Sequence, residues 1–129
     1  MQTERESLAE ADARAHRNAA EMSTAEIARF LQDTFSQRIV ALIAGIEDAK
    51  QVGRWAGGRN APRVDAEFRM RAAVQAFQYI ANCDNRHIAR AWMMGMNPQL
   101  EDDSPIEAIA ADRHKEVMAA ARSFHQGDL

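Results

Sequence analysis

The residues of this sequence best suited to chemistry are basic and amide side chains clustered between positions 50 and 63. They are Lys50, Gln51, Arg54, Arg59, Asn60 and Arg63. A glutamine amide can bond an adenine edge twice, and an arginine can bond guanine or a phosphate. Basic residues outnumber acidic ones within 37–63, although the whole chain has a formal net charge of −3. This local excess favours a phosphate-binding surface, but an excess of this size also arises by chance.

Other kinds of chemistry find little support in the sequence. The histidines and the single cysteine are too widely spaced for a zinc site; they are His16, His87, His114, His125 and Cys83. The neighbouring acids Asp102 and Asp103 stand in a polar stretch without the apolar surroundings that catalytic carboxylates need. We therefore expect no catalytic residue, no metal and no cofactor, and a protein that is not an enzyme.

Composition predicts an all-α protein. The 129 residues suffice for one compact domain or two very small ones, and 47% of them are hydrophobic. Helix-forming Ala, Glu, Arg and Gln are abundant, and no segment alternates as a strand does. The first residues lack the apolar core of a signal peptide, and no apolar run approaches the ~20 residues of a membrane helix. We expect a cytoplasmic protein that does not contact a membrane.

Local signals predict most of the helices. A capping box at Ser23-Thr24-Ala25-Glu26 starts one helix, and apolar spacing predicts others over about 37–44, 48–57 and 64–83. We expect Asp48 to cap the helix that ends near Gly57. The helix 64–83 is expected to bury a stripe that consists of Phe68, Val74, Phe77, Ile80 and Ala81.

Further helices are predicted toward the two ends of the chain. Asp84 or Asn85 can cap one that carries Ile88 inward, and Ser104-Pro105-Ile106-Glu107 is a strong start for a short one. Asp112 can cap the last helix, with Gly127 just past its end. Residues 1–22 predict a marginal, alanine-rich helix that is either frayed or docked on a partner.

The segments 37–44 and 48–57 together suggest a helix-turn-helix. Ala41 is the small contact residue, Gly45 suits the turn, and Val52 and Trp55 would hold the second helix inward. Lys50, Gln51 and Arg54 then face outward, whereas Arg59, Asn60 and Arg63 are better placed for phosphates. The turn is one residue longer than the commonest spacing. The alternative interpretation is a plain helical hairpin with a solvated basic face.

Two parts of the sequence resemble one family. The stretch from Ile43 to Pro62, with its Arg54-Trp55 pair before a glycine loop, is similar to the helix-turn-helix of Xre-type regulators. Trp92, then Asn97-Pro98-Gln99-Leu100, then Ser104-Pro105-Ile106-Glu107, resembles the C-terminal toxin-binding domain of Xre/MbcA/ParS antitoxins. The first motif is common to many regulators, whereas the second, in this order, is more specific. Together they cover roughly residues 25–125.

The resemblance implies a helix-turn-helix bundle followed by a small C-terminal helical domain. We divide the chain into an N-terminal extension (1–22), a DNA-binding region (23–83) and a toxin-binding-like region (84–129). Such antitoxins repress their own operon and block a toxin, usually a RES-domain protein that consumes NAD. The acidic Glu101-Asp102-Asp103 departs from the glycine-rich loop of the family.

The predicted toxin-binding residues are Trp92, Met93, Met96, Asn97 and Leu100. The cluster of Met93, Met94 and Met96 beside Trp92 belongs either to the core or to a protein-binding patch, because not all can face inward on one helix. A homodimer is expected, with the helix 64–83 and the Trp92 cluster as candidate interfaces. Two alternatives remain: a stand-alone DNA-binding regulator without a toxin, and a helical adaptor that binds only proteins.

Overall fold

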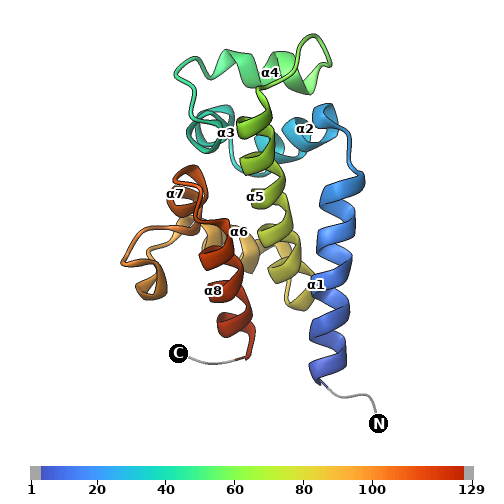
Figure 1. Ribbon diagram of the computed structural model, residues 1–129, viewed down its shortest axis with the longest axis vertical. Helices are drawn as coiled ribbons and strands as arrows, with labels where there is room; N and C mark the ends of the chain where they lie inside the picture. The colour runs from blue at the N-terminus through green and yellow to red at the C-terminus, as the bar shows by residue number, and fades with distance from the viewer. Residues whose placement is uncertain (1–3, 127–129) are drawn as a thin grey trace.

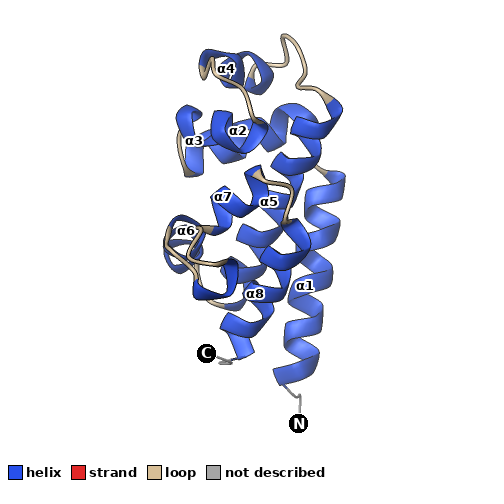
Figure 2. Ribbon diagram, turned by 60° about the vertical axis from the view of Figure 1, so that its left-hand side comes forward, coloured by secondary structure: helices blue, strands red, loops and turns tan. Residues whose placement is uncertain are grey.

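The computed structural model describes residues 4–126, and the side chains from 8 to 124. This part of the chain is helical and contains no strand, which confirms the predicted all-α class. Figure 2 shows helices joined by short loops. The elements are α1 (Glu4–Glu21), α2 (Thr24–Thr34), α3 (Gln37–Ala44), α4 (Lys50–Ala56), α5 (Val64–Cys83), α6 (Arg86–Met94), the 3₁₀ turn η1 (Pro98–Leu100), α7 (Pro105–Ala110) and α8 (His114–Gln126).

The long helix α5 is the centre of the fold. It packs against α1, α2, α3, α6, α7 and α8, and Figure 1 shows it running down the middle of the molecule. Its inner face is fully covered: Met70, Val74 and Ile80 have no exposed surface. The buried side chains of all the helices, from Ala11 to Ala121, form one cluster. The three segments expected from the sequence therefore share a common core.

Alanines dock α1 on α5. Ala11, Ala15 and Ala19 are at most 4% exposed, and their small side chains let the two helices approach closely. The sequence left this helix either frayed or bound to a partner. In the structure the surface it binds is α5 of the same chain, because a stripe of methyl groups spaced at i, i+4 and i+8 fits against a helix that is itself rich in alanine.

Arginine side chains bind the backbone carbonyls at the C-terminal ends of four helices. Arg71 Nη1 donates to Ala19 O (2.6 Å) and Met22 O (2.7 Å) at the end of α1. Arg69 donates to Ile43 O (2.8 Å) and Ala44 O (2.7 Å) at the end of α3. The remaining two are Arg90 on Thr34 O of α2 and Arg29 on Ala56 O of α4. Each places a positive charge on carbonyls that have no partner within their helix.

The predicted amino-terminal caps of α2 and α7 are confirmed. Ser23 and Glu26 form a reciprocal capping box, with Ser23 N donating to Glu26 Oε1 (2.7 Å) and Glu26 N to Ser23 Oγ (3.1 Å). Ser104 and Glu107 do the same at α7. Of the two proposed caps for α6, the structure uses Asn85, whose Oδ1 accepts from Ile88 N.

Two predicted caps are wrong. Helix α4 begins at Lys50 and has Ala49 at its cap position; Asp48 comes one residue earlier, with its Oδ1 accepting from Lys50 N at 3.0 Å and its backbone O from Gln51 N at 3.1 Å. Asp112 lies in the turn before α8, with φ of 64°, and pairs with Arg69 at 3.3 Å. Its carboxylate is drawn to a guanidinium on a distant helix instead of to the helix that follows. Gly127 lies outside the described residues.

Two residues predicted to lie in the core are at the surface. Phe68 is 56% exposed and Ile88 is 37% exposed. Phe68 belongs to the first turns of α5, where the neighbouring helices leave more than half of its surface exposed, although its ring makes a T-shaped contact with His114 at the start of α8. Helical spacing alone could not predict the exposure of Phe68, because it assigns the residue to the apolar face of the helix but does not show which other helices cover that face.

Candidate nucleic-acid interface

Helix α4 lies at one end of the molecule, packed on α2 and α3 (Figure 1). Gly45 ends α3 in the left-handed conformation (φ 77°), and Gly45 N and Ile46 N both donate to Ala41 O. Val52 and Trp55 are buried, at 0% and 5% exposure, and hold α4 against its neighbours. The predicted inward direction of both side chains is confirmed.

The opposite side of α4 faces solvent. Lys50 and Arg54, one helical turn apart, are both exposed. Gln51 is half-buried on the flank of the helix, where its Oε1 accepts a 3.5 Å hydrogen bond from Asn60 Nδ2. Arg59 is exposed in the loop that follows. The structure therefore brings the predicted DNA-binding residues of α4 and the following loop to one end of the molecule, and Gln51 is less accessible than expected.

Helices α3 and α4 approach each other closely at Gly53. A methyl group there would lie 2.8 Å from Gln37 Nε2, which itself donates to Gln32 Oε1 at 3.1 Å. The amides of Gln37 and Gln32 thus lie beside α4. Neither was predicted as a site residue, because only the packing of α3 against α4 places them there.

The basic side chains at this end of the molecule have few partners within the chain. Arg38, Lys50, Arg54 and Arg59 make no hydrogen bond or ion pair through their side chains among the described residues. Arg63, 90% exposed, has only a 3.8 Å contact with Asp65. An exposed ion pair of this length contributes little to the free energy of unfolding. These guanidinium and ammonium groups are therefore available to an anion.

The predicted toxin-binding residues are not all at the surface. Met93 and Leu100 have no exposed area, so their side chains would reach a partner only if the core opened. Trp92 is half-buried, with its ring 6.1 Å from that of Phe124. Met96, in contrast, is 77% exposed. Of the residues predicted to bind a toxin, Met93 and Leu100 therefore belong to the core, and Met96 is accessible to a partner.

Asn97 has a structural task at the start of η1. Its Oδ1 accepts from Gln99 N at 2.9 Å, and its backbone N–H donates to Asp103 O at 3.1 Å. Ile88 was not predicted as a surface residue, and Met94 was left either to the core or to a protein-binding patch; they are 37% and 38% exposed. Their exposure could not be read from spacing, since both lie on an amphipathic helix whose neighbours were unknown.

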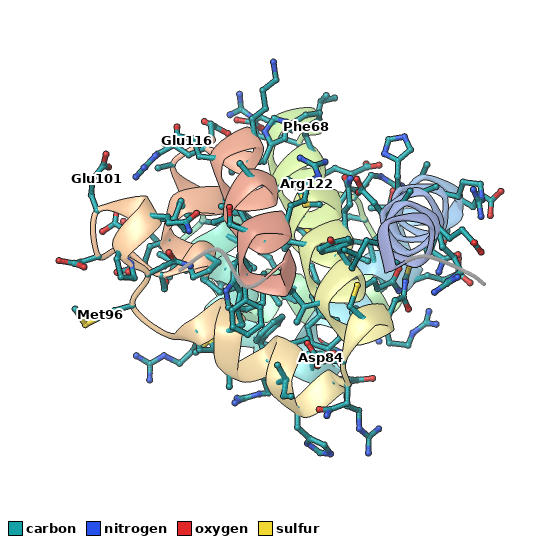
Figure 3. The ribbon with its side chains drawn as sticks, turned by 90° about the horizontal axis from the view of Figure 1, so that it is seen from below. Phe68, Asp84, Met96, Glu101, Glu116 and Arg122 are labelled. Carbon is teal, nitrogen blue, oxygen red and sulfur yellow. The ribbon has the colours of Figure 1, made fainter. Side chains whose placement is uncertain are left out.

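Arg113 fixes the acidic loop on α8. Its Nη2 lies 2.9 Å from Glu101 Oε1 and 2.8 Å from Glu116 Oε2, and Nη1 lies 3.4 Å from Asp103 Oδ2. The hydrogen bond from Arg113 holds the pKa of Glu116 below its ordinary value. Figure 3 shows Glu101 and Met96 projecting from the same side of the molecule. The loop therefore has a defined shape, with Glu101 and Asp102 in the left-handed region (φ 55° and 70°).

Cys83 is half-buried and stands near Tyr79. Burial raises the pKa of the Cys83 thiol and raises the pKa of Tyr79 to about 12. Both groups are thus held in their neutral forms at neutral pH.

In the part of the chain that the structure describes, no three His, Cys, Asp or Glu side chains converge as a metal site would require. Within the same residues, no helix has the length and apolar character to cross a bilayer.

Comparisons with protein-family models, with curated proteins and with solved structures found no significant match for this chain.

Proposed function

We propose that this protein is a non-enzymatic regulator that binds duplex DNA through α4 and serves as an antitoxin of the Xre/MbcA/ParS kind. One observation carries the DNA-binding part. The short helix α4 is held by its buried face, and it presents to solvent basic side chains that have no partner among the described residues.

The dimensions and chemistry of α4 suit a DNA groove. The major groove of B-DNA admits an α-helix, and its base edges are read by arginine and amide side chains. Lys50 and Arg54 lie on the outward face, while the loop after the helix supplies Arg59 for the phosphate backbone. The negative net charge of the whole chain does not oppose this, because within 37–63 the basic residues outnumber the acidic ones.

The antitoxin part rests on the resemblance of the C-terminal region and on the exposed apolar side chains near it. Ile88, Met94 and Met96 offer exposed apolar surface on and after α6, and Met96 projects from the same side of the molecule as Glu101 in the acidic loop that Arg113 holds (Figure 3). Methionine-rich surfaces adapt readily to protein partners. The stand-alone regulator without a toxin is the second candidate, and it shares the same α4 surface.

Fluorescence anisotropy tests the DNA-binding part. The labelled probes are a duplex from the region upstream of the protein's own gene and a scrambled duplex of equal length. Arg54→Ala should weaken binding to the upstream duplex by about 1–3 kcal/mol if Arg54 bonds a base. Arg86→Ala, which removes an exposed arginine from the first turn of α6, is the matched control and should leave binding unchanged.

Salt dependence separates phosphate contacts from base contacts. Lys50→Ala and Arg59→Ala should weaken binding to both duplexes, and each should lower the salt slope by about 1 if it removes one phosphate contact. Binding that is absent at low salt, or that Arg86→Ala weakens as much as Arg54→Ala does, would contradict the proposal.

Co-expression tests the antitoxin part. Each small protein encoded by a neighbouring gene is expressed with and without this chain, and growth and cellular NAD are measured. Restored growth that Met96→Asp abolishes, while circular dichroism stays unchanged, supports a toxin-binding surface. If no neighbouring product arrests growth, the stand-alone regulator replaces the antitoxin.

A further inference from the structure

An uncovered apolar groove lies at the start of α5. Val64 is 88% exposed and Phe68 is 56% exposed, and these two side chains are one helical turn apart. With Arg63, Asp65 and Asp112 they line an open groove between α5 and the turn before α8. In Figure 3, Phe68 projects outward near the beginning of α8.

The exposure of Phe68 stands out from its surroundings. The rest of α5 is the most deeply packed element of the fold, yet its first two turns have an open side. The Phe68 ring makes a T-shaped contact with His114, with the centroids 4.9 Å apart and the planes at 80°, and the residue is still 56% exposed. Adjacent large apolar side chains with a charged rim are typical of protein interfaces.

The rim carries charges of both signs. Arg63 is 90% exposed, whereas the carboxylates of Asp65 and Asp112 are 61% and 68% exposed. Arg69 neutralises those acids only partly, because it lies behind them at 12% exposure and its Nε and Nη2 are bonded to backbone carbonyls. Two exposed carboxylates would repel a phosphate backbone, so nucleic acid does not suit this groove.

A second copy of the same chain does suit it. In an isologous contact the same patch occurs on both sides, so it must contain both members of every ion pair that forms across the axis. A patch with charges of one sign would repel its own copy. This groove has an exposed guanidinium and exposed carboxylates around a common apolar centre, and it therefore complements itself.

We propose that this groove is the interface of a homodimer with two-fold symmetry. Phe68 and Val64 of each subunit pack against the same pair in the other, and Arg63 approaches the partner subunit's Asp65 and the partner subunit's Asp112. The axis runs alongside the first turns of α5. The sequence indicated the helix 64–83 as one candidate interface, and the structure narrows it to the exposed first two turns.

The homodimer would also place two copies of α4 for DNA binding, an inference that rests on the proposed function. Only the loop 57–63 separates α4 from α5, and both α4 and the start of α5 lie at the same end of the molecule (Figure 1). An axis parallel to α5 leaves both copies of α4 at one end of the dimer. Such a dimer would read two half-sites that form an inverted repeat.

Sedimentation velocity over a range of protein concentrations tests the interface without DNA. The wild-type chain should show a concentration-dependent monomer–dimer equilibrium, and Phe68→Glu should raise the dimer dissociation constant at least about tenfold. Met96→Glu is the matched control, because it places the same charge at another exposed apolar side chain. A wild-type chain that stays monomeric at several hundred micromolar, or a dimer that only Met96→Glu disrupts, would overturn the proposal.

A charge-reversal experiment tests the pairing across the axis. Arg63→Glu leaves only acidic groups on the rim, and Asp65→Lys replaces one of the two carboxylates that Arg63 of the partner subunit approaches by a like charge, so each variant should dimerise more weakly than the wild type. Mixing the two variants should restore association as a heterodimer, which a tag on one of them identifies. Absence of heterodimer in the mixture would overturn the pairing. None of these measurements involves DNA, so a failure of the interface is distinct from a failure of DNA binding by α4.

Discussion

Replacing Arg69 should weaken the fold more than replacing any exposed arginine. Arg69→Met keeps the apolar stem of the side chain but removes the guanidinium. Its Nε and Nη2 donate to Ile43 O at 2.8 Å and Ala44 O at 2.7 Å, the last carbonyls of α3 before the turn that leads to α4. The side chain is 12% exposed, so water replaces these bonds poorly.

The expected loss follows from these contacts. A hydrogen bond from a charged donor contributes about 1.5–3 kcal/mol, and deleting the donor leaves two carbonyls at the end of α3 without it. The ion pairs with Asp65 and Asp112 add less than about 1 kcal/mol, because both carboxylates are more than half exposed. The two bonds share one side chain and are not additive, so we expect a loss of about 3 kcal/mol in the free energy of unfolding.

Urea denaturation followed by circular dichroism at 222 nm measures this loss. Arg63→Met, which removes a 90% exposed guanidinium at the N-cap position of α5, is the control and should change stability by less than about 0.5 kcal/mol. The dependence of unfolding free energy on urea should be equal for both variants. If Arg69→Met costs less than about 1 kcal/mol, arginine capping is not a substantial part of what holds α3 on α5.

Three further predictions concern local features. Ser104→Ala breaks the capping box with Glu107 at the start of α7 and should lower stability by about 1 kcal/mol, which thermal melting would detect. Cys83 should react with iodoacetamide at pH 7.5 more slowly than a free cysteine, because burial raises its pKa and depletes the thiolate; an equal rate would contradict this. The hydrogen bond from Arg113 lowers the pKa of Glu116 from 4.5, so the stabilisation is present above pH 4.5 and disappears as pH falls through the lower folded value. The stability advantage of the wild type over Glu116→Gln should therefore shrink in acid, and an advantage that grew below pH 4.5 would refute the assignment.

Much of the candidate site could be predicted because it depends on neighbours in sequence. Val52 and Trp55 share one face of a short helix, and that spacing fixes Lys50 and Arg54 on the other. The lower accessibility of Gln51 could not be predicted, since its partner Asn60 comes from a loop whose path depends on the tertiary fold. Whether the site binds DNA stays a prediction.

The sequence by itself determined the features that arise within one or two helical turns. The capping box at Ser23 depends on side chains that bond their own backbone, and the left-handed turn at Gly45 depends on a residue without a side chain. Those interactions span three to five residues and are visible in the order of the letters.

Only the tertiary structure decided which faces are covered. Periodicity placed Phe68 with the buried side chains of α5, yet it is 56% exposed, whereas Met93 and Leu100 are enclosed by helices from elsewhere in the chain. The arginine caps likewise join residues 25 or more positions apart, as between Arg69 and Ala44. Burial is a property of the whole assembly of helices, because an apolar side chain leaves water only where another part of the chain arrives to cover it.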